Sequence, residues 1–190
     1  MDFFPLYLST KQQRVLIVGG GEVAYKKLKK LHSFGVEVAL ISPEYSNLCL
    51  CYMHKHAISY QTRPYEEGDI IGYSLVVLAT NSPSLHHAIY EESRQERVLV
   101  NATDSLVQSD VIFPSVVVRE GLSVAFSTQG ASPALSKALA SYFETKIPHN
   151  IGAFIAHLGT LRATLPQGKS RMALFRRLVR VYMRKHFFEK

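Results

Sequence analysis

Apolar and polar positions along the first 112 residues follow two alternating patterns. Short continuous apolar runs, which are typical of buried parallel strands, are separated by segments whose apolar residues recur at helical spacing. The runs that predict strands are 15–18, 36–41, 57–61, 74–80 and 97–101. The segments that predict helices are 24–33 and 85–94. Because strands alternate with helices, the pattern predicts an α/β fold with a doubly wound parallel sheet.

A glycine-rich turn joins the first predicted strand to the first predicted helix. Gly19, Gly20 and Gly21 follow the apolar run, and Gly19, Gly21 and Ala24 fill the spacing G-x-G-x-x-G/A. Small residues at these positions allow a tight turn, close approach of the backbone to a pyrophosphate, and close packing of helix on strand. The free N–H groups and positive dipole end of the helix then face the phosphates. The motif predicts a Rossmann-like dinucleotide-binding domain.

The second predicted strand ends in Ser42, Pro43 and Glu44, where dinucleotide-binding proteins normally carry an acid that holds the adenosine ribose. The Ser42 hydroxyl is able to hydrogen-bond a ribose, and Glu44 lies close enough in sequence to replace the acid. No arginine follows at once to bind a 2′-phosphate. The segment therefore favours NAD over NADP as the cofactor.

The pattern changes after residue 112. Two apolar runs, 115–119 and 122–127, flank a glycine and predict a pair of strands joined by a turn. Ser132 followed by Pro133 is typical of a helix start, and we expect a helix from there toward Lys146. A hairpin and helix outside the main sheet indicate a dimerisation unit.

The end of the chain is strongly basic. Residues 151–190 contain nine lysines and arginines against one acid, a net charge of +8, whereas residues 1–150 contain 13 basic and 14 acidic residues. Leu174, Leu178 and Val181 recur at helical spacing, so a helix with an arginine-rich opposite face is expected. This charge suits nucleic acid, an anionic membrane surface or a polycarboxylate substrate, and a merely solvated helix face is the alternative.

These patterns divide the chain into three expected parts. They are an NAD-binding Rossmann domain over 1–113, a dimerisation module over 114–148 and a basic helical region over 149–190. No apolar stretch approaches the length of a membrane span, and the opening residues lack the features of a signal peptide, so we expect a cytoplasmic protein. Cys49 and Cys51, near an expected surface helix, have neither disulfide nor Cys-x-x-Cys spacing, and we expect both to be reduced.

Several motifs together resemble one known family. They are PLYL (5–8), VLIVGGGEVA (15–24), ATN (79–81), NATD (101–104), IFPS (112–115), STQGASP (127–133) and GTLR (159–162). In this order and spacing they are similar to the precorrin-2 dehydrogenase/sirohydrochlorin ferrochelatase family, which includes the N-terminal part of sirohaem synthases. The resemblance runs from end to end of the chain.

The resemblance implies that precorrin-2 is oxidised to sirohydrochlorin with NAD as hydride acceptor, and that in many members ferrous iron is then inserted to give sirohaem. It also implies a homodimer and a tetrapyrrole substrate with many carboxylates, which the basic C-terminal region would receive. Neither nucleic acid nor a membrane is then expected as a partner. Nothing in the sequence resembles the uroporphyrinogen methyltransferase module of sirohaem synthases, so we expect a stand-alone enzyme.

The resemblance also implies roles for individual residues. Those expected at the cofactor pyrophosphate are Glu22 and Val23; those beside the adenosine ribose are Ser42, Pro43 and Glu44; those across the cofactor crevice are Ala79, Thr80 and Asn81. Asp104 matches the aspartate that is proposed to act in both dehydrogenation and chelation. Such a carboxylate is able to take a proton as hydride leaves, or to accept pyrrole protons as the metal enters. An isolated aspartate after a strand would more often cap a turn or a helix.

The histidines do not predict a metal site. His54 and His56 have no acids nearby, and two ligands alone make a poor site. His86 and His87 are adjacent on a predicted helix, so their side chains point about 100° apart. We expect surface or packing roles for all four, and the sequence leaves the metal ligands unknown.

Two other functions are compatible with the sequence. A non-enzymatic NAD-sensing regulatory domain would need neither an acid in the crevice nor a site for a polyanion. A nucleic-acid-binding protein would use the basic tail, and its affinity would fall steeply with salt.

Overall fold

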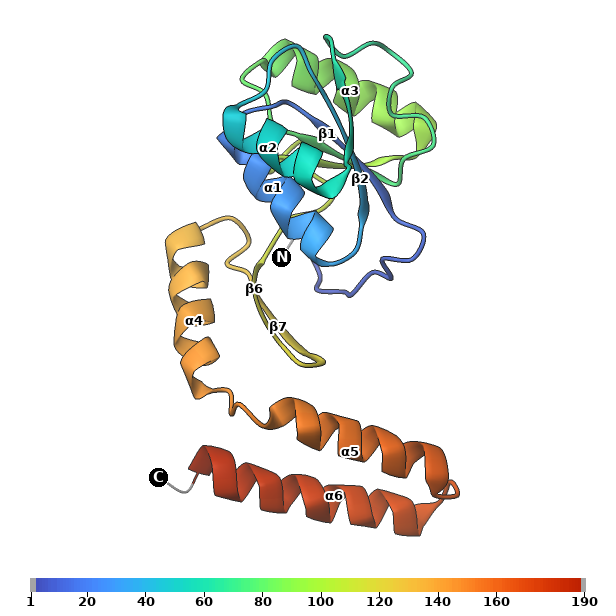
Figure 1. Ribbon diagram of the computed structural model, residues 1–190, viewed down its shortest axis with the longest axis vertical. Helices are drawn as coiled ribbons and strands as arrows, with labels where there is room; N and C mark the ends of the chain where they lie inside the picture. The colour runs from blue at the N-terminus through green and yellow to red at the C-terminus, as the bar shows by residue number, and fades with distance from the viewer. Residues whose placement is uncertain (1–2, 189–190) are drawn as a thin grey trace. The chain divides into compact units, whose positions relative to one another are not determined.

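The computed structural model describes residues 3–188, and the chain forms two compact units, residues 1–112 and 113–190. The first unit contains a five-stranded sheet whose strands are all parallel (Figure 1). Strands β1 to β5 span Arg14–Val18, Glu37–Ser42, Ser59–Thr62, Leu75–Leu78 and Leu99–Ala102. Their order in the sheet is β3-β2-β1-β4-β5, so the order reverses between β1 and β4. In open α/β sheets the ligand binds at the carboxyl ends of the strands at such a reversal.

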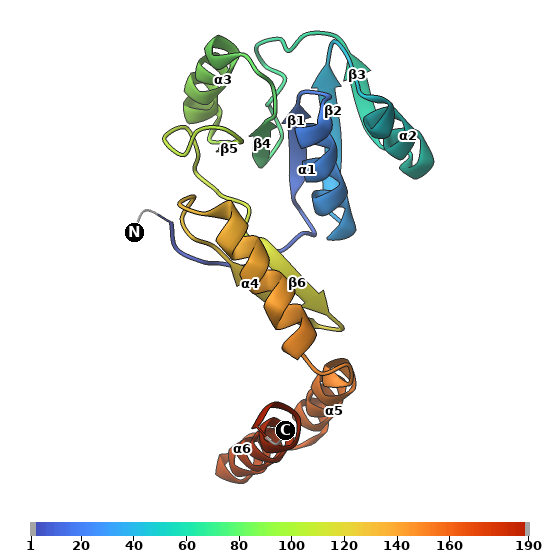
Figure 2. The same ribbon diagram turned by 90° about the vertical axis from the view of Figure 1, so that its left-hand side faces the viewer.

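Both faces of this sheet are buried. The helices α1, α2 and α3 span Glu22–Ser33, Asn47–His56 and Pro83–Glu96. Leu16 and Val18 of β1 belong to a core cluster with Ile89 of α3. Alternate residues of a strand point to opposite faces, so the equally buried Val15 and Ile17 face the other side. There α1 packs against α2 and β1, and Figure 2 shows α3 lying apart from both helices. The predicted doubly wound fold is confirmed.

Two strands begin two residues later in the structure than the hydrophobic pattern predicts. The runs 57–61 and 97–101 were expected to be strands, but β3 begins at residue 59 and β5 at residue 99. Ala57 (φ 52°) and Arg97 (φ 56°) instead take the left-handed conformation that ends the preceding helix. Glycine usually occupies this position, so the sequence carries no sign of the helix end at either place.

The expected surface helix around the two cysteines is α2, which continues through His54 and His56. Only one face of this helix is on the surface: Cys51 is exposed, whereas Cys49 is fully buried. Both thiols are free, as expected. Cys49 faces inward because α2 packs against α1.

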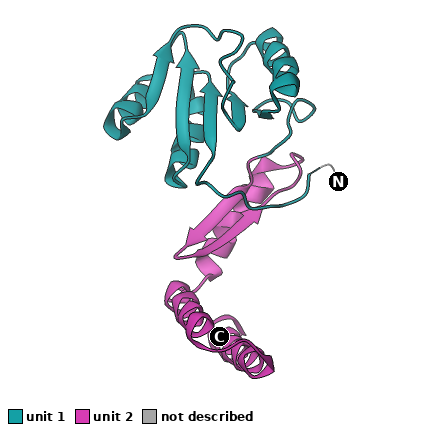
Figure 3. Ribbon diagram, turned by 90° about the vertical axis from the view of Figure 1, so that its right-hand side faces the viewer, with its two compact units in different colours: residues 1–112 teal, residues 113–190 magenta. Residues whose placement is uncertain are grey.

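The second unit, coloured magenta in Figure 3, consists of a hairpin and helices. Its elements are β6 (Ser115–Arg119), β7 (Leu122–Phe126), α4 (Pro133–Lys146), α5 (Ile151–Thr164), α6 (Lys169–Met183) and a π-helical turn (Arg184–Phe188). β6 and β7 are antiparallel, and a core cluster joins Val117, Ala140, Ile151 and Tyr182. The division of this unit into a dimerisation module and a basic region stays a prediction. Within residues 3–188 no helix is long and apolar enough to cross a membrane.

Candidate functional site

The glycine loop between β1 and α1 is held close to two other loops. Gly19 has φ +124°, which only glycine adopts readily, and a Cβ there would overlap the carbonyl oxygen of Ala79. A Cβ on Gly20 would overlap the carbonyl oxygen of Glu44 and the ring of Tyr45. Gly21, in contrast, has nothing within 4 Å of its Cβ position. Two of the glycines are therefore required by packing within the protein, and the third faces open space.

The first turn of α1 has no side-chain cap. Gly21 is its N-cap residue, and no side chain accepts a hydrogen bond from the first N–H groups. In the same unit, Ser46 caps α2 and Ser82 caps α3 with their hydroxyl oxygens. The unpaired N–H groups and the dipole of α1 therefore point toward the open space at Gly21, which is the arrangement that binds phosphate.

The N-cap residue and the first turn of α2 contact the backbone of the glycine loop. The Ser46 N–H donates to the Gly20 carbonyl oxygen at 2.9 Å, and the Cys49 thiol lies 3.9 Å from the Gly21 carbonyl oxygen. Burial raises the pKa of the Cys49 thiol, so it stays neutral beneath the loop. The role of Cys49 is thus to pack against the backbone of the glycine loop.

The expected ribose segment follows β2. Ser42 is buried, and its hydroxyl donates to the Glu44 carbonyl oxygen at 2.6 Å. The Ser42 oxygen keeps a lone pair as acceptor, whereas its hydrogen is used to shape the turn. Pro43 and Glu44 are exposed. The Tyr45 hydroxyl donates to the Gln61 carbonyl oxygen at 2.7 Å, and burial raises the pKa of Tyr45 to about 12.

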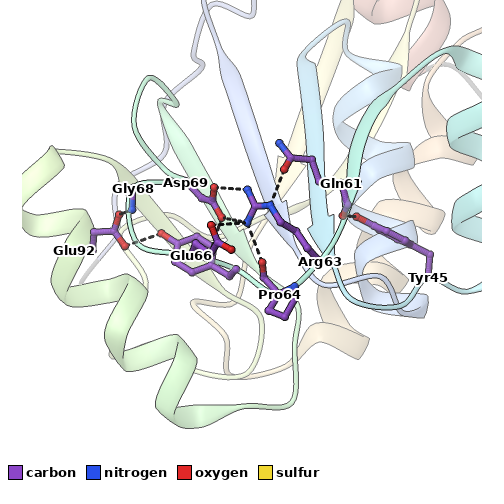
Figure 4. Close-up of polar contacts among 9 residues, drawn as sticks. Tyr45, Gln61, Arg63, Pro64, Glu66, Gly68, Asp69 and Glu92 are labelled. Carbon is purple, nitrogen blue, oxygen red and sulfur yellow. Dashed lines mark hydrogen bonds and ion pairs between the residues drawn. The ribbon is translucent and has the colours of Figure 1, made fainter.

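The first arginine that follows this segment is already paired (Figure 4). Arg63 donates two hydrogen bonds of 2.7 Å to the two carboxylate oxygens of Asp69, and its Nε donates to Gln61. The Arg63 guanidinium lowers the pKa of Asp69, so the carboxylate stays charged and the pair is retained at neutral pH. The positive charge of Arg63 is therefore compensated within the protein.

Ala79, Thr80 and Asn81 extend β4 on the other side of the glycine loop. The Ala79 N–H donates to Val18 at 2.8 Å, which continues the parallel ladder one residue past the strand. The Thr80 hydroxyl oxygen accepts the Ser82 N–H at 3.3 Å. These residues thus lie at the carboxyl edge of the sheet, next to the glycine loop.

Asp104 lies in a loop just past β5. The loop is closed at its base by Ser109, whose hydroxyl oxygen accepts the Ala102 N–H at 3.0 Å. The Thr103 N–H donates to Leu78 at 3.2 Å, which keeps the chain beside the end of β4. The Asp104 side chain is 59% exposed. Its carboxylate is thus anchored through the backbone and open to solvent.

His86 joins Asp104 to the end of β4. It lies in the first turn of α3, and its side chain is only 2% exposed. Its Nδ1 lies 3.3 Å from Asp104 Oδ1, and its Nε2 makes a 2.9 Å hydrogen bond with Thr80 Oγ1. The burial of His86 agrees with the expected packing role, and it is accompanied by two polar contacts that the sequence did not predict. Its place in the first turn of a helix that begins at the crevice was the available signal in the sequence.

A part-buried lysine ties α1 to the strand that leads to Asp104. Lys27 Nζ donates to Asn101 Oδ1 at 3.1 Å, and the Asn101 amide donates to the Val111 carbonyl oxygen. Burial, and secondarily the charge of Lys30, lower the pKa of Lys27 to about 8. A fraction of Lys27 is therefore neutral at physiological pH.

The structure thus brings the predicted residues to one edge of one sheet. Gly19 to Gly21, with the first helical turn that contains Glu22, Val23 and Ala24, follow β1; Ser42 ends β2, and Pro43 and Glu44 follow it; Ala79 to Asn81 follow β4. Val23 is 46% exposed, and Ala24 is fully buried against the strand. Within residues 3–188 no three His, Cys, Asp or Glu side chains are grouped as metal ligands.

A protein-family model described as "Putative NAD(P)-binding" matches residues 6–115, more than half of the chain. The chain belongs to this family. The match spans the glycine loop, the segment after β2, the end of β4 and Asp104.

The chain is also similar to proteins named "Siroheme synthase". It is 34% identical over 190 residues to that of Nitrosococcus oceani and 31% identical over 190 residues to that of Methylococcus capsulatus, in both cases across 100% of the chain. The protein of Photobacterium profundum is 28% identical over 165 residues, or 87% of the chain. The chain spans only 35–39% of the length of these relatives. The resemblance inferred from the motifs is confirmed.

A solved structure described as "SirC, precorrin-2 dehydrogenase" has the same fold. Its TM-score is 0.71 at 24% identity, and the alignment covers 94% of this chain and 89% of that chain. Both units of the present chain are therefore part of a fold that is already known.

We predict that Gly21→Asp abolishes NAD binding and leaves the fold intact, because the new side chain and its negative charge would enter the space at the α1 N-terminus. Gly159 on α5 also has nothing within 4 Å, so Gly159→Asp is the matched control and keeps its NAD affinity. Calorimetric titration measures the affinity, and circular dichroism verifies folding. Unchanged NAD affinity in a folded Gly21→Asp variant would mean that the glycine loop has a function other than NAD binding.

Proposed function

We propose that the chain is a precorrin-2 dehydrogenase, which oxidises precorrin-2 to sirohydrochlorin with NAD as hydride acceptor. One observation carries the proposal: an uncapped helix start at an open glycine lies at the same sheet edge as an exposed carboxylate. The first feature suits a dinucleotide pyrophosphate, and the second suits proton transfer. The similarity to siroheme synthases supports the choice of substrate.

The residues present fit NAD better than NADP. The N–H groups at Gly21, Glu22 and Val23 would hold the pyrophosphate, and the Ser42 oxygen and the Glu44 carboxylate would accept hydrogen bonds from the ribose. An added 2′-phosphate would meet the negative charge of Glu44. Arg63 is no partner for that phosphate, because its guanidinium is already bound by Asp69. We therefore infer a preference for NAD.

In the proposed reaction the tetrapyrrole loses a hydride and a proton. NAD, when bound, supplies the hydride acceptor. The Asp104 carboxylate takes the proton, because it is exposed at the sheet edge and is held there by the closed loop after β5. Ala79, Thr80 and Asn81 line the opposite side of the glycine loop and would bound the cofactor there.

Ferrous iron would be a second substrate of the same site. Insertion of iron into sirohydrochlorin releases two pyrrole protons, and Asp104 is the carboxylate at the sheet edge that we assign to accept them. The tetrapyrrole itself would hold the metal through its four nitrogens. This step needs no cluster of protein ligands.

The basic residues of α5 and α6 fit the carboxylates of the substrate. Four exposed arginines lie on these helices: Arg162, Arg176, Arg177 and Arg180. Exposed guanidinium groups bind carboxylates in bidentate geometry. A nucleic-acid function would use the same charge, but the glycine loop and Asp104 would then have no purpose. A regulatory NAD sensor would leave both Asp104 and these arginines without a role. The cytoplasmic location of the protein stays a prediction.

A homodimer would cover an apolar stripe on α4. Leu135, Leu139 and Tyr142 follow the spacing i, i+4, i+7, and they are 52%, 36% and 57% exposed in the single chain. Large exposed side chains on one helix face are typical of a protein interface. We infer that a second copy of the chain packs on this face.

The enzyme assay tests the function directly. Purified protein with precorrin-2 and NAD should give the visible spectrum of sirohydrochlorin, more slowly with NADP, and added ferrous iron should convert it to that of sirohaem.

Asp104→Asn keeps the size of the side chain but removes the proton acceptor, so both ligands should still bind while turnover falls roughly 10²–10⁴-fold. Full activity of Asp104→Asn would refute its role. Loss of chelation alone would confine Asp104 to metal insertion.

We expect that replacing the four exposed arginines with glutamine weakens tetrapyrrole binding far more than NAD binding. The wild-type affinity for the tetrapyrrole should fall as salt rises. A control with the same change of charge replaces four exposed basic residues of the first unit: Lys11, Lys29, Lys55 and Arg97. Fluorescence titration measures both affinities. Equal tetrapyrrole affinity in the wild type, the arginine variant and the control variant would mean that the arginine-rich face of α6 is merely solvated.

The dimer is tested by light scattering after size exclusion. Wild-type protein should have twice the 21.4 kDa mass of one chain, and the double variant Leu135→Glu with Tyr142→Glu should have the single mass, because charges would enter the apolar contact. Lys137→Glu, an exposed residue of the same helix, is the control and should stay dimeric. A monomeric wild type would contradict the proposal.

A further inference from the structure

We propose that His86 is a positioning residue for Asp104: its buried imidazole, kept as the Nδ1–H tautomer, holds the Asp104 carboxylate and ties it to Thr80 at the end of β4. The geometry is that of a side chain 2% exposed between two polar groups, with Nδ1 3.3 Å from Asp104 Oδ1 and Nε2 2.9 Å from Thr80 Oγ1. The kinetic part of this inference rests on the proposed function. The assignment of the tautomer does not depend on the proposed function.

The groups that face the two ring nitrogens indicate the tautomer: Nδ1 lies 3.3 Å from the Asp104 carboxylate, and Nε2 is hydrogen-bonded to Thr80. An ionised carboxylate only accepts hydrogen bonds, so the nitrogen that faces Asp104 is the one that carries the hydrogen. At the other end of the ring, Thr80 Oγ1 already accepts the Ser82 N–H, so its own hydrogen is available to Nε2. The resulting chain runs from the Ser82 N–H through the Thr80 hydroxyl to Nε2, and from Nδ1–H to Asp104.

The surroundings give this chain its stiffness. His86 is in the first turn of α3, where its N–H donates to the carbonyl oxygen of the cap residue Ser82. The backbone N–H of His86 and its ring Nε2 are therefore both held within one short segment, residues 80–86. Asp104 comes from a different loop and is exposed, so the ring is the contact that relates its carboxylate to the segment beside the cofactor site. A displacement of about 1 Å is able to cost up to about a hundredfold in rate, which makes this alignment worth holding.

The neighbouring histidine provides a matched control. His87 is on the same helix turn and is exposed, whereas His86 is buried. Substitution of either residue changes the helix sequence to the same extent. Only His86 has the contacts with Thr80 and Asp104.

The tautomer is measured by nitrogen-15 NMR of histidine-labelled wild-type protein. We expect His86 to carry its hydrogen on Nδ1, and His87 to show the Nε2–H tautomer that is usual for imidazole in water. In Asp104→Ala the His86 hydrogen should move toward Nε2, since the acceptor at Nδ1 is gone. An Nε2–H tautomer of His86 in the wild type would overturn the proposal, as would a tautomer that is unaffected by Asp104→Ala.

Kinetics test the consequence for turnover. His86→Leu should lower kcat by up to about a hundredfold and leave the KM for NAD unchanged. His86→Asn, whose amide nitrogen is able to replace Nδ1, should recover most of the loss, and His87→Leu should have no effect. Unchanged kcat in His86→Leu would overturn the proposal, and equal losses in His86→Leu and His86→Asn would reduce the role to packing. A wild type without activity on precorrin-2 and NAD would refute the proposed function instead, while the NMR result would still decide the tautomer.

Discussion

The close approach of the glycine loop to its two neighbouring loops is the constraint on which the candidate site depends. Gly19 lies against the backbone of Ala79 and Gly20 against that of Glu44, so the ends of β1, β2 and β4 meet with no side chain between them. Any larger residue at these two positions would push the loops apart, because the nearest atom that it meets is in both cases a backbone carbonyl oxygen. The same contacts keep Gly21 and the start of α1 clear of other groups. The packing thus leaves open space at Gly21, at the point where the strand order reverses.

The edge of the sheet beyond this opening carries the groups suited to chemistry. β4 leads to Thr80, β5 leads to Asp104, and α3, which connects the two strands, supplies His86. A single β-α-β connection therefore provides all three members of the proposed chain of contacts. Because residues of this connection also belong to the core cluster, among them Val76, Ile89 and Val100, the positions of these side chains are fixed by the same packing that stabilises the fold.

The sequence predicted the parts of the site that are encoded locally. The glycine spacing, the apolar runs and the serine or proline helix starts each depend on residues that are neighbours in the chain, and the structure has them as expected. The left-handed ends of α2 and α3 were missed, because Ala57 and Arg97 stand where glycine is usual. The contact of His86 with Asp104 was missed for another reason: it joins two residues 18 positions apart, and no local pattern encodes it. The pairing of Arg63 with Asp69 was equally invisible, although it supports the preference for NAD that we infer.

The central claim is that the opening at Gly21 receives the pyrophosphate of NAD. The most direct measurement is a titration of nitrogen-15-labelled protein with NAD, followed through the backbone amide signals. Residues 19–24 should shift most, because their N–H groups would bind the phosphates, and residues 79–81 should shift with them, while the amides of α5 and α6 stay unmoved. Saturation with NAD that left the amides of residues 19–24 in place would contradict the account.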